Sequence, residues 1–388
     1  MVSERRLCIH YSLLQFLYWT LFAAYYAFGA AYLYSLGLSS SLTGLTFACA
    51  GILSAVIQPL VAGVADRSAR FTTKSLAVLL TAPACACLFG AWLCPKDAAV
   101  AVVLYAAGWT LLIALQFLIN AFGMEYAAAG SALNFGVCRA FGSLGYAVFS
   151  YLLGLATARW GTGVTLPFGA VCCLLLLTAL ALWPPAPRAL PVSAAMTATQ
   201  KGGLFARYPR FAVFVAGSLL SMVAYCMCTS FLVRIVENLG GGSTQLGTAI
   251  FITALCEIPT IFLSTRLRKR FGSGRLMRFT AVMLALKLIL VALSGSMGFL
   301  YAAMAMQLFS YSLFVPVSVF YADGRMGPGD KARGQAVMTL VQTLGNAGGA
   351  LLGGVLLDAF GVSGMLLFLC VCSVVGAAGM LLGVENVA

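Results

Sequence analysis

The stretch LVAGVADRSARFTTK, residues 60–74, gathers Asp66, Arg67, Arg70 and Lys74 directly after a long apolar run. This concentration of charge is unusual in a chain of 388 residues of which only 9% are charged and 62% are hydrophobic. Charged residues make up about a quarter of an ordinary soluble domain, and apolar residues about half. A water-soluble protein of this composition would lack the polar side chains needed to cover its surface. The composition therefore predicts an integral membrane protein.

Apolar runs long enough to cross a bilayer recur along the whole chain. A spanning helix needs about 20 apolar residues, whereas a closed β-barrel would need short alternating strands, and these are absent. The first run follows Arg5 and Arg6, is long and lacks a small-residue cleavage site, so it is interpreted as a spanning helix rather than a signal peptide. Breaks at charges, Pro and Gly delimit twelve runs, at 9–34, 40–63, 75–93, 99–124, 136–157, 164–183, 210–233, 244–264, 277–294, 299–322, 335–357 and 362–384. The sequence predicts an all-α protein with twelve transmembrane helices.

The basic residues predict how the helices are oriented. The gaps after even-numbered spans lie on one side of the membrane together with both termini, and that side holds 19 of the 23 Lys and Arg residues. By the positive-inside rule this side is the cytoplasm. The net charge of +13 is therefore a topology signal. No soluble module carries a basic face, so nucleic acid is not an expected partner.

A polar segment divides the spans into two groups of six. Residues 184–209 contain five prolines and form the longest polar gap, which predicts a cytoplasmic linker between bundles at 1–183 and 210–388. A shift of 200 positions places Pro59 on Pro259 and Gly154 on Gly354, among other weak matches. We therefore expect two pseudo-symmetric six-helix bundles, which is a common plan of membrane transporters.

The opening stretch resembles a family signature. GVADRSAR, residues 63–70, is similar to the motif between helices 2 and 3 of the major facilitator superfamily, and the twelve spans and central linker agree. The resemblance implies that Gly63, Asp66, Arg67 and Arg70 form a cytoplasmic gate that holds the two halves together when the outer side is open. The alternative is that these charges only anchor the topology.

A finer resemblance concerns two pieces of sequence. NFGVCRAFGSLGY, residues 134–146, is similar to the start of helix 5 in the group of lactose permease, oligosaccharide:proton symporters and phenylpropionate-type permeases, which implies sugar contacts for Arg139 and Tyr146. ALCEIPTIF and LALKLIL place Glu257 and Lys287 where that group has an acid and a base. The group's second acid, in helix 10, has no counterpart in SYSLFVPVSVF, residues 310–320, so Glu257 has to do more of the coupling.

Glu257 and Lys287 interrupt apolar runs at the same predicted depth. Each lies nine residues from a basic residue at the cytoplasmic boundary, Arg266 and Arg278 respectively, or about 13 Å at ~1.5 Å per residue. A lone charge at that depth costs about 2.5–3.5 kcal/mol, and pairing or protonation of Glu257 would relieve this cost. The pair is interpreted either as a proton-coupling site or as a static ion pair between helices 8 and 9.

Further polar and aromatic side chains are candidates for a substrate cavity. Arg139 is interpreted as a substrate contact or as a topology anchor paired with Glu125. Gln116 and Asn120 share one helix face and either line the cavity or bond between helices. Tyr25, Tyr146 and Tyr311 can stack on a sugar or aromatic solute, the alternative being core packing.

The sequence predicts a monomeric, multi-pass transporter of the cell (inner) membrane that imports a sugar, nucleoside or aromatic acid together with a proton. A proton-coupled drug or metabolite efflux antiporter is the main alternative, although helix 4 lacks a basic residue and helix 5 lacks a Gly-Pro motif. A receptor or assembly factor is a third hypothesis. No nucleophile–base pair or metal-ligand cluster predicts an enzyme, a cofactor or a metal, and the 13 cysteines are interpreted as packing residues.

Overall fold

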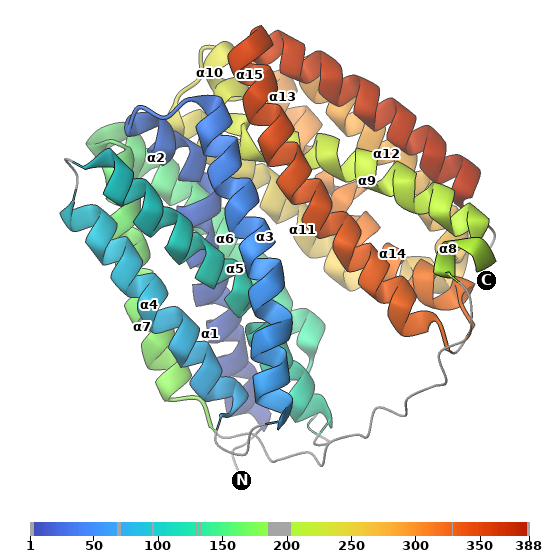
Figure 1. The fold of residues 1–388 in the computed structure, drawn as a ribbon, viewed down its shortest axis with the longest axis horizontal. Coiled ribbons are helices and arrows are strands. Elements are labelled where there is room, and N and C mark those ends of the chain that lie inside the picture. Colours follow the sequence, from blue (N-terminus) through green and yellow to red (C-terminus); the bar gives the residue numbers. More distant parts are fainter. Residues whose placement is uncertain are drawn as a thin grey trace. The chain divides into compact units, whose positions relative to one another are not determined.

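The computed structural model describes residues 4–67, 71–94, 97–128, 131, 133–184, 203–327 and 329–385. Over these ranges the regular secondary structure is helical throughout (Figure 1), which confirms the all-α prediction. The chain forms two compact units. Unit 1 is Met1–Ser193 with Gly242–Phe251, and unit 2 is Ala194–Gly241 with Ile252–Ala388.

Unit 1 is a bundle of long helices, coloured blue to green in Figure 1. They are α1 (Glu4–Phe22), α3 (Ser40–Arg67), α4 (Thr73–Leu93), α5 (Ala98–Ala128), α6 (Phe135–Trp160) and α7 (Thr165–Ala181). A π-helical segment, Ala23–Ala27, and the short α2, Gly29–Ser35, continue α1. Lys74 donates to the carbonyl oxygens of Ala181 (2.6 Å) and Trp183 (2.8 Å), so a cation caps the C-terminal end of α7.

Unit 2 contains the remaining helices. They are α8 (Leu204–Arg207), α9 (Pro209–Ser230), α10 (Leu232–Asn238), α11 (Ser243–Phe271), α12 (Ser273–Ala292), α13 (Met297–Ala305), α14 (Tyr311–Arg325) and α15 (Lys331–Gly383). The first turns of α11 belong to unit 1. The 53-residue α15 doubles back at Gly361, whose φ of 66° lies in the left-handed region, and its two arms appear in orange and red in Figure 1.

The number of spans agrees with the prediction of twelve. Ten helices in the described ranges are long and apolar enough to cross a membrane, and one of them, α15, contains two spans joined at Gly361. The twelfth span is α12, which has 20 residues and carries Arg275, Arg278 and Lys287.

Three spans are interrupted, which the sequence did not predict. Span 1 passes through the π-helical segment, span 7 breaks at Phe231 between α9 and α10, and span 10 passes through a 3₁₀ turn, Met306–Leu308, between α13 and α14. In lipid, backbone groups that leave a helix need partners within the protein, and such breaks occur where a cavity or a bound solute requires them.

Side-chain hydroxyls satisfy the backbone at two of these breaks. In span 10, the carbonyl oxygen of Leu308 accepts from Thr260 Oγ1 at 2.9 Å and from Ser312 Oγ at 3.2 Å. In span 1, the hydroxyl of Tyr105 on α5 donates to the carbonyl oxygen of Tyr25 within the π-helical segment. These bonds come from other helices or from the next turn, so the interruptions are built into the fold.

The glycine-rich face of span 11 permits close packing on α9. A Cβ atom on Gly349 would lie 2.5 Å from the carbonyl oxygen of Val223. Only a residue without a side chain lets the two backbones approach this far, which is a common way for membrane helices to associate.

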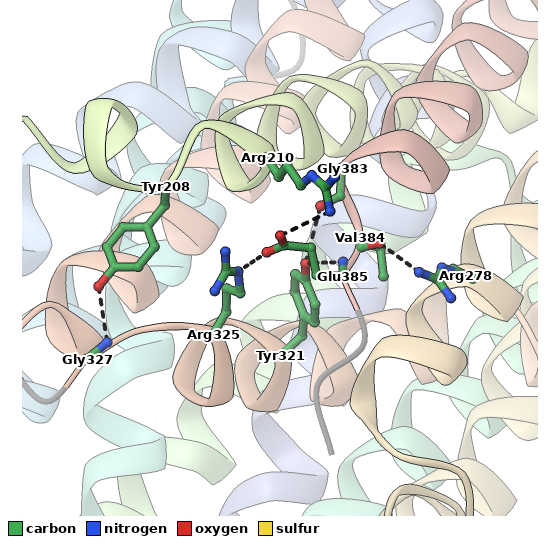
Figure 2. A network of polar contacts seen from close by, with 9 residues as sticks. All are labelled: Tyr208, Arg210, Arg278, Tyr321, Arg325, Gly327, Gly383, Val384 and Glu385. Carbon is green, nitrogen blue, oxygen red and sulfur yellow. Dashed lines mark hydrogen bonds and ion pairs between the residues drawn. The ribbon is translucent and has the colours of Figure 1, made fainter.

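Polar contacts tie together the helix ends at one end of unit 2 (Figure 2). Glu385, directly after α15, is paired with Arg210 of α9 at 3.3 Å and also with Arg325 of α14. The backbone N–H of Glu385 donates to the hydroxyl of Tyr321 at 3.1 Å. Arg278 of α12 donates to the carbonyl oxygen of Val384 at 2.9 Å. One carboxylate and the chain around it therefore connect four helices.

Candidate functional site

Glu257 and Lys287 are joined by a third side chain in unit 2. Lys287 on α12 donates from Nζ to Oε1 of Gln307, which lies in the 3₁₀ turn of span 10. Gln307 in turn donates from Nε2 to Oε1 of Glu257 on α11, at 2.8 Å. The structure thus brings together both residues predicted for proton coupling, with a neutral amide between them.

The chemistry of the three groups determines the orientation of the amide. An ammonium group only donates hydrogen bonds and an ionised carboxylate only accepts them. The carbonyl oxygen of Gln307 must therefore face Lys287 and its NH2 group must face Glu257. Lys287 is 1% exposed and Gln307 is fully buried, whereas Glu257 retains partial exposure. A buried ammonium group without an acceptor would destabilise the protein. The hydrogen bond to the amide oxygen of Gln307 therefore favours the observed position of Lys287.

Two tyrosines extend this cluster. Gln307 Nε2 also donates to the hydroxyl of Tyr225 on α9 at 3.0 Å, and Lys287 Nζ lies 5.2 Å from the centre of that ring. Tyr311, predicted as a cavity residue, is partly exposed and stacks on Tyr225 with ring centres 4.1 Å apart and planes within 8°. The cluster therefore ends in a flat aromatic surface at the start of α14.

Unit 1 contains a second cluster, around Arg139 on α6. Its guanidinium carbon lies 4.0 Å from the ring centre of Trp19 on α1, and its NH1 donates to Ser143 Oγ at 3.4 Å. Trp19 Nε1 donates to Gln15 Oε1 at 3.2 Å. Glu125, the other predicted partner of Arg139, instead accepts a hydrogen bond from Thr73 at the start of α4.

Gln15 connects this cluster to α5. Its Nε2 donates to the hydroxyl of Tyr11 at 2.9 Å and to Asn120 Oδ1 at 3.3 Å. Asn120 and Gln116, one turn apart on α5, are both partly exposed. For Asn120 the structure thus gives an interhelical hydrogen bond, which is one of the two roles predicted for it.

The aromatic side chains of unit 1 differ in exposure. Tyr146 is partly exposed and lies 6.3 Å, ring centre to ring centre, from Trp19 at an interplanar angle of 89°. Tyr25 is 1% exposed, and its hydroxyl donates to the carbonyl oxygen of Ala84 at 3.4 Å, which fits the alternative prediction of core packing. Its neighbour Tyr26 is partly exposed and stacks on Trp109 at 5.7 Å and 15°.

The predicted gate falls only partly within the described residues. Gly63 lies in α3, and the backbone of Asp66 and Arg67 forms the last turn of that helix. The side chains of Asp66 and Arg67, and the whole of Arg70, lie outside the described residues.

Sequence reasoning missed Gln15 and Tyr225 as members of the two clusters. Gln15 carried a usable signal, because it is a polar side chain within an apolar run, four residues before Trp19. Tyr225 carried none, since its position opposite Tyr311 depends on the breaks in spans 7 and 10. In the ranges that the structure describes, no group of three or more His, Cys, Asp or Glu side chains is placed to hold a metal ion.

Comparisons with known proteins agree with this architecture. The family model described as "MFS_1 like family" matches residues 8–369. A maltose permease of Geobacillus stearothermophilus is 29% identical over 386 residues, covering 93% of this chain and 92% of that protein. A putative sugar efflux transporter of Deinococcus radiodurans is 26% identical over 226 residues, or 58% of each chain.

Solved structures show the same fold at low sequence identity. A mutant of the nucleoside transporter NupG superposes with a TM-score of 0.80 and 17% identity, over 98% of this chain and 100% of that one. A bacterial homologue of the human lysosomal transporter Spinster, in an inward-facing and occupied conformation, gives a TM-score of 0.69 and 14% identity over 99% and 97% of the two chains.

Proposed function

The chain belongs to the MFS_1-like family and is a secondary transporter of small solutes, and we propose that it imports a sugar together with a proton. The observation that carries this proposal is the chain of contacts from Glu257 through Gln307 to Lys287. It joins a partly exposed carboxylate to a buried ammonium group on three different spans. An enzyme activity is excluded by the family.

The proton would bind at Glu257. As a carboxylate, Glu257 accepts a hydrogen bond from Gln307 Nε2. When a proton adds to one carboxylate oxygen, the group becomes neutral, and the other oxygen remains only a weaker, uncharged acceptor for the amide. The bond to Gln307 weakens, and the 3₁₀ turn that carries Gln307 loses one of its attachments. Proton uptake at Glu257 would thereby favour a different bend of span 10.

A sugar is the solute that the side chains favour over a nucleoside or an aromatic acid. Arg139, Gln116 and Asn120 offer several hydrogen-bonding groups, while Trp19 and Tyr146 offer apolar ring faces. A sugar ring has the same two properties, hydroxyl groups around its edge and C–H groups on its face. The similarity to a protein named as a maltose permease supports this choice.

Sugar efflux is the second candidate, because one relative is named as a putative sugar efflux transporter. The same coupling site can serve either direction, depending on whether proton and solute bind together or in turn. Import is favoured here because the similarity to the permease covers 93% of the chain, against 58% for the efflux relative.

Orientation, gating and oligomeric state belong to the same proposal. Both termini face the cytoplasm, in accordance with the distribution of Lys and Arg. Gly63, Asp66, Arg67 and Arg70 form the cytoplasmic gate. The transporter acts as a monomer in the cell membrane, since a single chain supplies both clusters.

Transport in vesicles tests the proposal. The purified protein in liposomes receives an inward proton gradient, and uptake of radiolabelled maltose, glucose, adenosine and a phenylpropionate is followed with and without an ionophore that collapses the gradient. We expect gradient-driven accumulation of a sugar, to about 50-fold for one proton at 100 mV. Two results would instead indicate antiport. One is dissipation of the inward proton gradient without accumulation of sugar inside the vesicle, and the other is export of sugar from the vesicle against its own concentration gradient.

A further inference from the structure

Four exposed cations surround the turn between α11 and α12. Arg266, Lys269 and Arg270 lie in the last turns of α11, and Arg275 lies in the first turn of α12. We call these four residues the α11–α12 basic cluster. Within the described ranges none of them takes part in an ion pair. Like charges one helical turn apart repel each other, and a bound anion would relieve this repulsion.

The other cations at this end of unit 2 have acceptors, apart from Arg268, whose guanidinium carbon lies 4.1 Å from the ring centre of Phe320. Arg210, Arg278 and Arg325 contact Glu385 or the carbonyl oxygen of Val384, as Figure 2 shows. Arg207 and Arg333 pair with Asp330 at 2.8 and 3.8 Å, and Lys331 pairs with Asp323 at 3.0 Å. The positive-inside rule accounts for cations on this side but not for four exposed cations gathered around one turn of unit 2 without an acid among the described residues.

Exposed phenylalanines lie one helical turn from these cations, on the bilayer side. Phe262 precedes Arg266 by four residues on α11, and Phe279 follows Arg275 by four residues on α12. Residues four apart share a helix face. Phe262 is 49% exposed and Phe279 is 41% exposed, so in a membrane both rings contact acyl chains. Each helix therefore presents an apolar ring at acyl-chain depth and an arginine about 6 Å further out.

We propose that the α11–α12 basic cluster binds an anionic phospholipid. Arg266 and Arg275 would hold the headgroup phosphate, for which the planar guanidinium offers paired donors, while Phe262 and Phe279 contact the acyl chains. In the orientation proposed above, the lipid belongs to the cytoplasmic leaflet. It would join the two helices that carry Glu257 and Lys287, yet its binding does not depend on proton coupling.

The positive charge of the cluster and the two phenylalanine rings contribute separately to the affinity for a phospholipid, and variants can measure the two contributions one at a time. Each Lys or Arg near an anionic surface contributes about fivefold in affinity. An acidic protein segment or free phosphate would use the cations but not the lipid-facing rings. A phospholipid would use both.

The test titrates purified full-length protein with phosphatidylglycerol, phosphatidylcholine or inorganic phosphate, and measures thermal stability together with lipid retention in native mass spectrometry. We expect phosphatidylglycerol alone to bind and to raise Tm. Arg266→Gln/Arg275→Gln should weaken this binding about 25-fold, whereas Arg266→Lys/Arg275→Lys keeps the charge but loses the paired guanidinium donors and should weaken it by less. Phe262→Ser/Phe279→Ser should weaken it without a change of charge.

The matched control is Arg5→Gln/Arg6→Gln. It also removes two positive charges, but from exposed positions at the start of α1. It should bind phosphatidylglycerol like the unaltered protein. Equal loss in the control and in Arg266→Gln/Arg275→Gln would show only general attraction of lipid to a basic protein and would overturn the proposal. So would a Tm shift with inorganic phosphate as large as that with phosphatidylglycerol, or unchanged binding in the arginine-to-glutamine variant.

Discussion

Nε2 of Gln307 lies 2.8 Å from Oε1 of Glu257. This hydrogen bond attaches the carboxylate to the turn that interrupts span 10, because Gln307 lies in that turn. Gln307 itself cannot gain or lose a proton at physiological pH. It would respond instead to the charge of Glu257, because its NH2 group donates a stronger hydrogen bond to a carboxylate than to the carbonyl oxygen of a protonated acid. A carboxyl group on α11 is thus linked to a backbone break between α13 and α14.

The substitution Glu257→Gln tests where the proton binds. The amide keeps the size of the side chain and one acceptor for Gln307, but it carries no exchangeable charge. We expect gradient-driven accumulation to be lost, while exchange of labelled for unlabelled solute at equal concentrations continues. Both are measured in the same vesicle preparation.

Glu237→Gln is the control, because Glu237 is an exposed acid paired with Arg234 at 2.9 Å and lies outside the cluster. This variant should accumulate solute normally. If Glu257→Gln accumulates solute as well as the control does, the proton binds elsewhere and the coupling role of Glu257 is wrong.

Gln307→Leu tests whether the amide holds Lys287 in place. The substitution leaves a buried ammonium group without its acceptor, and breaking such a partnership costs about 3–5 kcal/mol. We expect a large fall in Tm. In the double variant Gln307→Leu/Lys287→Met the uncompensated charge is gone, so most of the stability should return. A double variant no more stable than Gln307→Leu alone would show that the amide acts through packing.

The sequence predicted the membrane fold and the two charged residues of the unit 2 cluster, because both depend on composition and spacing. Glu257 and Lys287 lie in apolar runs where each is conspicuous, and antiparallel spans put them at one depth. The amide between them was not predicted. Gln307 reaches both charges because span 10 leaves the α-helix at Met306–Leu308. That turn contains no Gly or Pro from which the break could have been predicted.

The same limit explains the difference between Tyr25 and Tyr26. A regular helix gives no reason to prefer either as the cavity residue. The π-helical segment Ala23–Ala27 contains one more residue in its turn and so changes which side chain points into the core. Here Tyr25 enters the core and Tyr26 keeps partial exposure. A local backbone feature without a sequence signature therefore determines which of the two tyrosines is buried.

Arg139→Lys tests the role of the guanidinium in unit 1. Lysine keeps the positive charge but cannot lie flat 4.0 Å from the Trp19 ring or present paired donors to a solute. If Arg139 contacts the solute, KM should rise about tenfold or more, corresponding to the loss of about 1.4 kcal/mol, with little change in Tm. An anchor of topology needs only charge, so unchanged uptake kinetics in this variant would favour the anchor interpretation.

Glu385→Gln tests the polar network at the ends of the unit 2 helices. Glu385 is 22% exposed and pairs with both Arg210 and Arg325, whereas Glu237 is 47% exposed and, among the described residues, pairs with Arg234 alone. Exposed pairs contribute about 0–1 kcal/mol, and less accessible charged hydrogen bonds about 1.5–3 kcal/mol. We expect Glu385→Gln to lower Tm clearly more than Glu237→Gln. Equal shifts would show that the network adds no stability beyond an ordinary surface pair.

Tyr25→Phe and Tyr26→Ala test the assignment made by the π-helical segment. Tyr25→Phe removes the hydrogen bond to Ala84 inside the core, which should cost about 1 kcal/mol of stability and leave KM unchanged. Tyr26→Ala removes a partly exposed ring that stacks on Trp109, and an aromatic contact of this kind is worth about 0.5–1.5 kcal/mol. If that ring meets the solute, KM should rise about two- to twelvefold. The two variants separate an effect on stability from an effect on solute binding at adjacent positions. A rise in KM for Tyr25→Phe with none for Tyr26→Ala would show that Tyr25, and not Tyr26, faces the solute.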